Sequence, residues 1–311
     1  MAERFDMTQS QAAQKKRRRL SAALICLAMP ATIGTGLLLA QDRYMVVSIL
    51  ILIYTMLPFF MVFEKRRPKA REIVLIAMMS ALTVSVHIIF HITVPIQIGT
   101  AMVILSGISL GPEAGFLIGA VSRFVCNFYM GQGPWTPWQM FCWGLLGFLA
   151  GLAFNKVELD QLKSRNFKMI MGPVLCILFS LLLAWICYQI WPGDDTTFFG
   201  WRLYAFGFAG LLAGVLLQHK RLPVDGITLS VFTFFVVFII YGGVMNLWAL
   251  VHSSGLPGGQ ELSLAGLRTL LVSGAPYDLF HAGSAALCVF LFGDSIIRKL
   301  ERIKIKYGIY K

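Results

Sequence analysis

Charged side chains are scarce in this chain. Asp, Glu, Lys and Arg together make up only 14% of its 311 residues, whereas hydrophobic residues make up 57%. A soluble globular protein has about 25% charged and about 45–50% apolar residues, so this composition excludes an ordinary soluble domain. The apolar runs are roughly 18–25 residues long, the length of membrane-spanning helices and not of barrel strands. The sequence therefore predicts an all-α integral membrane protein.

Several chemical motifs are also missing. The chain contains no Gly-Lys pair, so it has no P-loop for ATP, and it has no His-Glu-x-x-His zinc motif. Its six cysteines form no Cys-x-x-Cys pair and lie inside apolar runs, as small buried hydrophobic residues do. These cysteines are Cys26, Cys126, Cys142, Cys176, Cys187 and Cys288. We expect no metal, no cofactor and no enzymatic activity.

Positive charge is plentiful but unevenly distributed. The net charge is +12, and nearly all of the 27 Lys and Arg residues fall between apolar runs on one expected side of the membrane. The exceptions are Arg43, Arg202 and Arg268 on the other side, and Arg123 within a span. Because cytoplasmic loops are enriched in Lys and Arg, we expect a multi-pass cell-membrane protein with both termini in the cytoplasm. This distribution indicates contact with the lipid bilayer and not with nucleic acid.

Ten apolar segments are candidate spans. They are residues 21–40, 44–63, 72–92, 96–110, 113–130, 138–155, 168–191, 199–217, 226–250 and 276–296. The turn at Gly111 and Pro112 predicts a tight hairpin between the fourth and fifth of them. Glycines four residues apart, such as Gly115 and Gly119 or Gly147 and Gly151, predict close packing of helix backbones.

One polar segment interrupts this series on the expected outer side. It runs Gly131-Gln-Gly-Pro-Trp135-Thr-Pro-Trp138-Gln139. Pro and Gly end helices, and Trp both favours the interface and offers a flat surface for stacking. Trp at an interface is usually only an anchor, but the amides and histidines around it favour a ligand site. We therefore expect this segment to be a lid.

Polar groups inside the spans are candidates for ligand contact, because each is costly in hydrocarbon. Arg123 has two open interpretations: it holds a partner from another helix, or it binds an anionic or carbonyl-bearing ligand. Pro276 and Asp278 suit the first turn of the last span, where helix capping is one explanation of the aspartate and ligand contact another. The predicted substrate-binding residues are His91, Gln97, Asn127, Trp135, Trp138, Gln139, Asn246, Trp248, Asp278 and His281.

The first part of the predicted bundle resembles a known family. Ala77-Met-Met-Ser-Ala81 matches the AxxxA motif on the first core helix of the S components of energy-coupling factor (ECF) transporters. Pro95-Ile-Gln97 is similar to the loop that follows that helix. The resemblance implies that Ala77 and Ala81 pack on a membrane-embedded coupling subunit. Ordinary packing within the chain is the alternative for these two alanines.

Two later blocks extend the resemblance. The Trp-containing segment, followed by Trp143-Gly-Leu-Leu-Gly-Phe-Leu-Ala-Gly, is similar to the third loop and fourth core helix of S components. Asn246-Leu-Trp248 and the stretch from Pro276 to Ala282 resemble the fifth and sixth helices. Against a six-helix S component, residues 1–69 add a basic N-terminus and an extra transmembrane helix pair. Residues 70–311 form the S-component-like domain, with an inserted pair at 168–217.

The resemblance also implies a function. An S component captures a vitamin-like small molecule at the outer face and works with a coupling subunit and two ATP-binding cassette ATPase subunits. Block similarity favours the S components assigned to cobalamin or its precursors. Two other functions stay open: a multi-span protein that senses a ligand or acts as a scaffold, and a self-powered secondary transporter.

Overall fold

The computed structural model describes residue 50 and residues 70–93, 96–154, 167–193, 197–217 and 226–309. The expected spans at 21–40 and 44–63 lie outside the described residues. Within the described ranges every regular element is helical, so the all-α prediction is confirmed. The helices are α4 (Ala70–Thr93), α5 (Ile98–Leu110), α6 (Pro112–Met130), α7 (Thr136–Ala153), α8 (Phe167–Ile190), α9 (Trp201–Leu217), α10 (Gly226–Val236), the π-helical turn η3 (Val237–Gly242), α11 (Gly243–Ser254) and α12 (Leu264–Tyr307).

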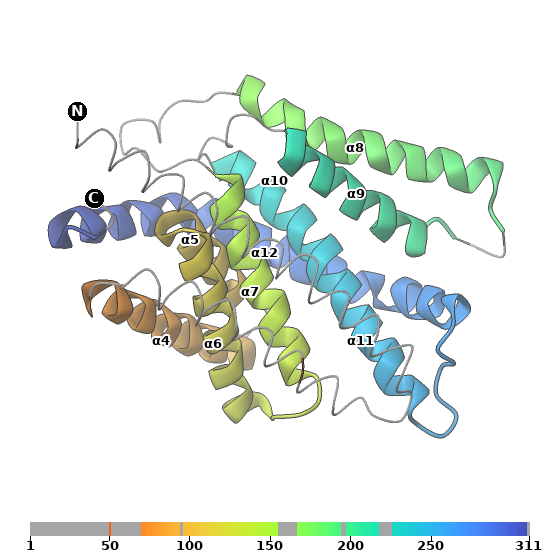
Figure 1. The fold of residues 1–311 in the computed structure, drawn as a ribbon, viewed down its shortest axis with the longest axis horizontal. Coiled ribbons are helices and arrows are strands. Elements are labelled where there is room, and N and C mark those ends of the chain that lie inside the picture. Colours follow the sequence, from red (N-terminus) through yellow and green to blue (C-terminus); the bar gives the residue numbers. More distant parts are fainter. Residues whose placement is uncertain are drawn as a thin grey trace, which may run out of the picture.

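The helices form one bundle around α5, α6 and α7 (Figure 1). Helix α4 packs on α5 and α6, while α8 and α9 run side by side at the edge of the bundle. Helix α12 packs on α5, α10 and α11. The apolar core has residues from most of these helices, including Ile104, Trp143 and Val289, each fully buried.

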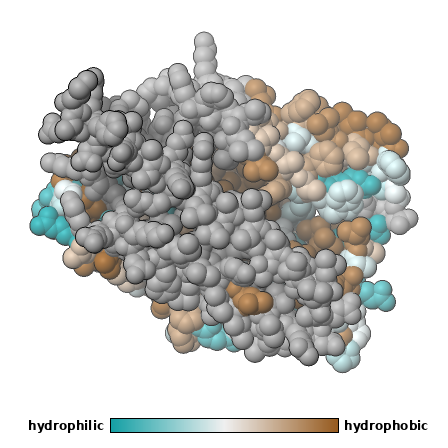
Figure 2. All heavy atoms as spheres, viewed as in Figure 1, coloured by the Kyte–Doolittle hydropathy of each residue, from teal (hydrophilic) through white to brown (hydrophobic). Residues whose placement is uncertain are grey.

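Three described helical segments are long and apolar enough to cross a membrane. They are Ala70–His91, Gly226–Ser254 and Leu264–Tyr307, and shorter apolar helices cover Ile98–Leu110 and Leu175–Ile190. Large apolar side chains on α8, among them Phe179 and Trp185, are exposed. Figure 2 shows this apolar surface at the upper right of the molecule. Such a surface suits lipid contact, as expected of an integral membrane protein.

The central helices approach one another closely. Helix α5 ends at Leu110 and α6 begins at Pro112, and Gly111 joins them with φ of +97°, which confirms the tight hairpin. A Cβ added to Gly147 would lie 2.6 Å from the carbonyl carbon of Gly115. The glycine pairs therefore permit backbone contact between helices, as their spacing predicts.

The last helix begins earlier than the sequence indicates. Helix α12 starts at Leu264, and Ser263 caps it by accepting a hydrogen bond from the Gly266 amide at 3.1 Å. Pro276 lies inside the helix and does not begin it. The prediction of a span beginning at Pro276 is therefore wrong, since a serine N-cap starts the helix first and membrane helices tolerate an internal proline. At about 1.5 Å per residue, α12 is about 66 Å long, more than a bilayer core requires.

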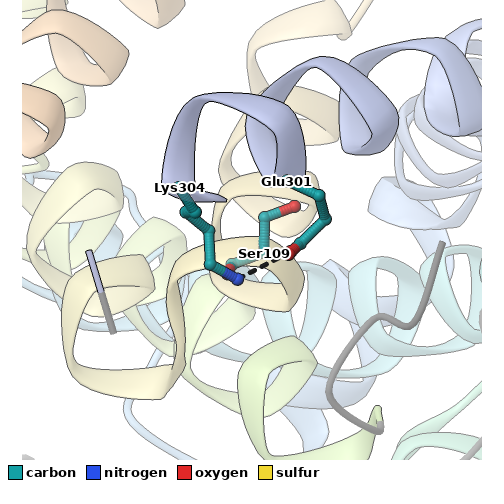
Figure 3. A network of polar contacts seen from close by, with 3 residues as sticks. All are labelled: Ser109, Glu301 and Lys304. Atoms are coloured by element: carbon teal, nitrogen blue, oxygen red, sulfur yellow. Dashed lines mark hydrogen bonds and ion pairs between the residues drawn. The ribbon is translucent and has the colours of Figure 1, made fainter. Parts of the chain in front are cut away.

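A hydrogen bond joins the C-terminal end of α12 to α5 (Figure 3). Lys304 Nζ donates to the Ser109 carbonyl at 2.6 Å and lies 2.7 Å from Glu301 Oε1. A cation at the C-terminal end of a helix satisfies a carbonyl that lacks an intrahelical partner. Ser109 also lies in Gly107-Ile-Ser-Leu-Gly111, which matches the Gly-x-Ser-x-Gly pattern of a nucleophile elbow. It closes a helix here, whereas that motif requires a strand-to-helix turn.

Candidate ligand-binding site

Arg123 of α6 is buried and has polar partners on both neighbouring helices. Its Nε donates to Gln139 Oε1 at 2.9 Å, and its Nη1 lies 3.1 Å from His87 Nε2. Its guanidinium carbon lies 5.1 Å from the centre of the Trp143 ring. Asn127, one turn further along α6, donates to the same Gln139 oxygen at 2.9 Å. Arg123 makes no ion pair with a described carboxylate.

This arginine determines which nitrogen of His87 carries hydrogen. Arginine only donates hydrogen bonds, so His87 Nε2 accepts one and the neutral ring holds its hydrogen on Nδ1. Neither His87 Nδ1 nor the Trp143 indole nitrogen has a hydrogen-bond partner among the described residues, although both are buried. Buried polar groups are nearly always paired. Unpaired donors beside a buried arginine therefore favour a ligand that carries hydrogen-bond acceptors.

A second polar cluster surrounds Asp278 of α12. Tyr204 of α9 donates to Asp278 Oδ2 at 2.9 Å, and Asn246 of α11 donates to the same oxygen at 2.7 Å. Asn246 also donates to the carbonyl of Gly242 at 2.8 Å. The aspartate lies in the fourth turn of α12, so the predicted role at the helix N-terminus is wrong. Its environment comes from three helices and not from its own helix end.

The first turn of α5 lies between the two clusters. Thr100 Oγ1 is 3.0 Å from Nε2 of His281, which follows Asp278 by one turn of α12. A Cβ added to the neighbouring Gly99 would lie 2.7 Å from His87 Cβ, so His87 packs directly on the α5 backbone. His281 Nδ1 is buried and unpaired within the described ranges. The two clusters therefore belong to one connected polar region inside the bundle.

The loop formed by the Trp-containing segment is shorter than the sequence predicts. Helix α6 ends at Met130 and α7 begins at Thr136, so only residues 131–135 connect them. Thr136 Oγ1 accepts from the Gly133 amide at 3.2 Å and from Asn127 Nδ2 at 2.9 Å, which ties the loop to both helices. The Trp135 ring meets the Trp248 ring edge-on at 6.2 Å. The loop thus lies close to the middle of α11.

Trp138 differs from its expected position. It lies in the first turn of α7 and is only 1% exposed, inside the apolar core. A proline near the start of the helix places Thr136 and the residues after it in helical conformation, and this rotates the Trp138 indole inward. Of the two tryptophans expected in the lid, only Trp135 stands in the loop.

The structure brings most of the predicted residues into this region and leaves some at its edge. Asn127 and Gln139 join the first cluster, and Asn246 and Asp278 form the second. Trp135 and Trp248 meet at the loop, and Gln97 is buried just before α5. His91 is exposed, with its ring 5.6 Å from that of His87. The roles of these residues in binding stay predictions.

Tyr204 and Thr100 were missed by the sequence analysis. Both are hydroxyl groups within apolar helices, and such groups often hydrogen-bond only to their own helix. The position of Tyr204 near the expected outer end of its span, two residues after Arg202, was the only available signal. Its pairing with a residue 74 positions away depends on tertiary packing.

Comparison with known protein families found a match for part of the chain. Residues 67–198 match the family described as the ECF-type riboflavin transporter, S component. The match confirms, over these residues, the resemblance to an ECF-type S component. Such a protein is the membrane subunit of a transporter that takes a small vitamin-like solute and works with an energy-coupling module. Searches of curated proteins and of solved structures found no match.

The matched range includes one of the two polar clusters and not the other. It includes α4 to α8 and ends before α9. The residues around Arg123 come from α4, α6 and α7, inside the matched range. Those around Asp278 come from α9, α11 and α12, outside it. Because the match includes α8, the extent of the inserted pair at 168–217 stays a prediction.

Proposed function

We propose that this protein is an S component, the substrate-capture subunit of an ATP-driven ECF-type importer. It binds a vitamin or related micronutrient at the outer face and releases it inside, together with a membrane-embedded coupling subunit and two ATP-binding cassette ATPase subunits. The observation that carries the proposal is the buried Arg123 cluster, which has unpaired hydrogen-bond donors beside it inside a membrane protein of this family. A ligand group with carbonyl acceptors complements such a cluster.

Riboflavin is the first solute to test. The matched family is described by that vitamin, and the flavin ring combines a flat aromatic surface with two carbonyl groups. The ring suits Trp135 and Trp248, and the carbonyls suit Arg123 and the Trp143 indole N–H. The cobalamin preference from the sequence has no support from the comparisons, so cobalamin serves as the competing solute.

The partner surface that we propose lies on α4. Ala77 and Ala81 are both exposed, and Ile73, Val74 and Met78 beside them are between 49% and 62% exposed. Small residues among large apolar ones allow close approach of another helix in lipid. This face suits the coupling subunit, whereas the opposite face of α4 packs on the bundle through Leu75 and Met79.

The decisive experiment combines purification with a binding titration. We expect native mass spectrometry of the protein, purified together with its coupling subunits, to show a bound vitamin and both ATPase subunits. Added riboflavin should lose fluorescence on binding, because the site contains tryptophans. A protein that stays alone and binds neither riboflavin nor cobalamin would favour the sensor or scaffold. Uptake that needs no ATPase subunit and collapses with the proton gradient would favour the secondary transporter.

Trp135→Ala is expected to weaken riboflavin binding by about tenfold, because one stacking contact of about 1–1.5 kcal/mol is lost. Melting temperature should change little, since Trp135 stands in a loop. Trp138→Ala should instead lower the free energy of unfolding by about 3–5 kcal/mol, as expected for a buried aromatic residue. Trp191→Ala is the control, because Trp191 is 77% exposed at the end of α8. Equal affinities of the Trp135 and Trp191 variants would contradict the lid.

A further inference from the structure

The carboxylate of Asp278 is incompletely satisfied. Both described donors, Tyr204 and Asn246, bind the same oxygen, Oδ2. The other oxygen, Oδ1, accepts no hydrogen bond from a described residue, and no described cation pairs with the carboxylate. Asp278 is nevertheless only 4% exposed, at a depth where charge is costly. A structural aspartate in such a place usually has a cation beside it.

Two glycines in the surrounding backbone leave room for this carboxylate and for Asn246. A Cβ added to Gly242, the last residue of η3, would lie 2.7 Å from Asp278 Cγ. A Cβ added to Gly274 would lie 3.2 Å from Asn246 Cγ. Tyr204 is held in turn by stacking on Phe238, with ring centres 5.3 Å apart and an angle of 19° between the planes. Three helices thus fix the orientation of one acceptor.

We propose that Asp278, oriented by Tyr204, is a second binding subsite that accepts a hydrogen bond from a donor group of the transported solute. The donor is a hydroxyl, an N–H or an ammonium group. This inference rests on the proposed function. The Arg123 cluster supplies donors to one part of the solute, and the Asp278 subsite supplies an acceptor to another. The link through His281 and Thr100 keeps both in one region.

The subsite also implies a role in solute binding for the helix pair that the sequence predicts as an insertion at 168–217. Tyr204 belongs to α9, which follows the matched range 67–198. Helix α9 therefore acts on selection of the solute, since removal of its tyrosine leaves Asn246 as the only described donor that orients Asp278. Tyr204 is a positioning residue, because it touches the aspartate and not the solute.

The test measures the affinities of riboflavin and of lumiflavin, which has the same ring system without the ribityl hydroxyls. Asp278→Asn keeps an oxygen for Tyr204 and removes the charge, and should weaken riboflavin binding about 10- to 100-fold. A loss for riboflavin alone identifies a hydroxyl as the donor, and an equal loss for both flavins identifies the ring N–H. Asp294→Asn, sixteen residues along the same helix and about 24 Å away, is the control and should change neither affinity.

Tyr204→Phe separates positioning from simple structural support. We expect it to weaken the binding of the same flavins that Asp278→Asn weakens, by about threefold to tenfold. A lower melting temperature with unchanged affinities for both flavins would show that Tyr204 only stabilises the fold. Unchanged flavin affinities in Asp278→Asn would overturn the subsite.

A labelling measurement decides the subsite even if riboflavin is the wrong solute. Failure of the wild-type protein to bind riboflavin would count against the solute named above, not against Asp278. Dicyclohexylcarbodiimide, an apolar reagent for membrane carboxyl groups, should label Asp278, and a panel of riboflavin, cobalamin and thiamine should include one vitamin that reduces the labelling. Absence of labelling, or labelling that no vitamin in the panel reduces, would overturn the proposal.

Discussion

Replacing Arg123 with Gln is expected to weaken riboflavin binding about 100-fold, which corresponds to about 2.7 kcal/mol. The arginine is 7% exposed and is the only described cation with hydrogen bonds to both His87 and Gln139. Its loss removes a charged donor to the solute, and such hydrogen bonds contribute about 1.5–3 kcal/mol. It also releases His87, whose Nε2 then lacks its donor. The measurement is a fluorescence titration of purified protein.

Two further variants show which property of Arg123 causes the loss of affinity. Arg123→Lys keeps the charge but loses the planar set of donors, so we expect an intermediate loss of about tenfold. Arg268→Gln removes a cation from the first turns of α12 and serves as the control, with unchanged affinity. Circular dichroism should show the same helical content in all three proteins. An Arg123→Gln variant with wild-type affinity would mean that the arginine only holds its helix neighbours together.

Gly147→Ala is expected to cost about 3 kcal/mol or more of folding stability, at the upper end of the range for overpacked cores. The added methyl group would lie 2.6 Å from the Gly115 carbonyl carbon and 3.1 Å from its Cα. Both are backbone atoms of α6, so no side chain can rotate away. Helices α6 and α7 must separate, and this displaces Gln139 from Arg123. The measurement is the melting temperature of the purified protein, with riboflavin affinity as a second reading.

The matched control for this substitution is Gly283→Ala. Gly283 is also a helical glycine, in α12, but a Cβ added there would have no atom within 4 Å. Alanine favours a helix over glycine by up to about 1 kcal/mol, so this variant should be slightly more stable than the wild type. If both variants were equally stable, close packing of α6 on α7 would be wrong.

The sequence by itself determined the fold class of the protein and indicated the family that part of it resembles. Long apolar runs with few charges leave only a helical membrane protein, because backbone groups in lipid must be satisfied within each segment. Gly111 and Pro112 determined the hairpin between α5 and α6, since glycine adopts positive φ freely and proline starts a helix. The order of Ala77-x-x-x-Ala81, the Trp-containing segment and the C-terminal blocks indicated an S component, and the family match confirms this resemblance over residues 67–198.

The two polar clusters could not be predicted from the sequence, because they join residues that are far apart in the chain. Arg123 had two open interpretations until its neighbours were known, and its partners Gln139 and His87 lie 16 and 36 residues away. Asp278 had helix capping and ligand contact as open explanations, and the sequence did not show that Tyr204 and Asn246 reach it from 74 and 32 residues away. Side-chain pairing between helices depends on their rotation and depth, and local patterns contain neither quantity.

Tertiary structure also decided which tryptophan stands in the lid and where the last helix begins. Trp135 and Trp138 are equivalent by composition, and the start of α7 at Thr136 separates them into a loop residue and a core residue. Ser263 caps α12, whose first residue, Leu264, is twelve residues before Pro276, so a proline that suits a first turn becomes an internal one. Local signals state which conformations a residue tolerates, and packing selects the one that buries the most apolar surface with its polar groups paired.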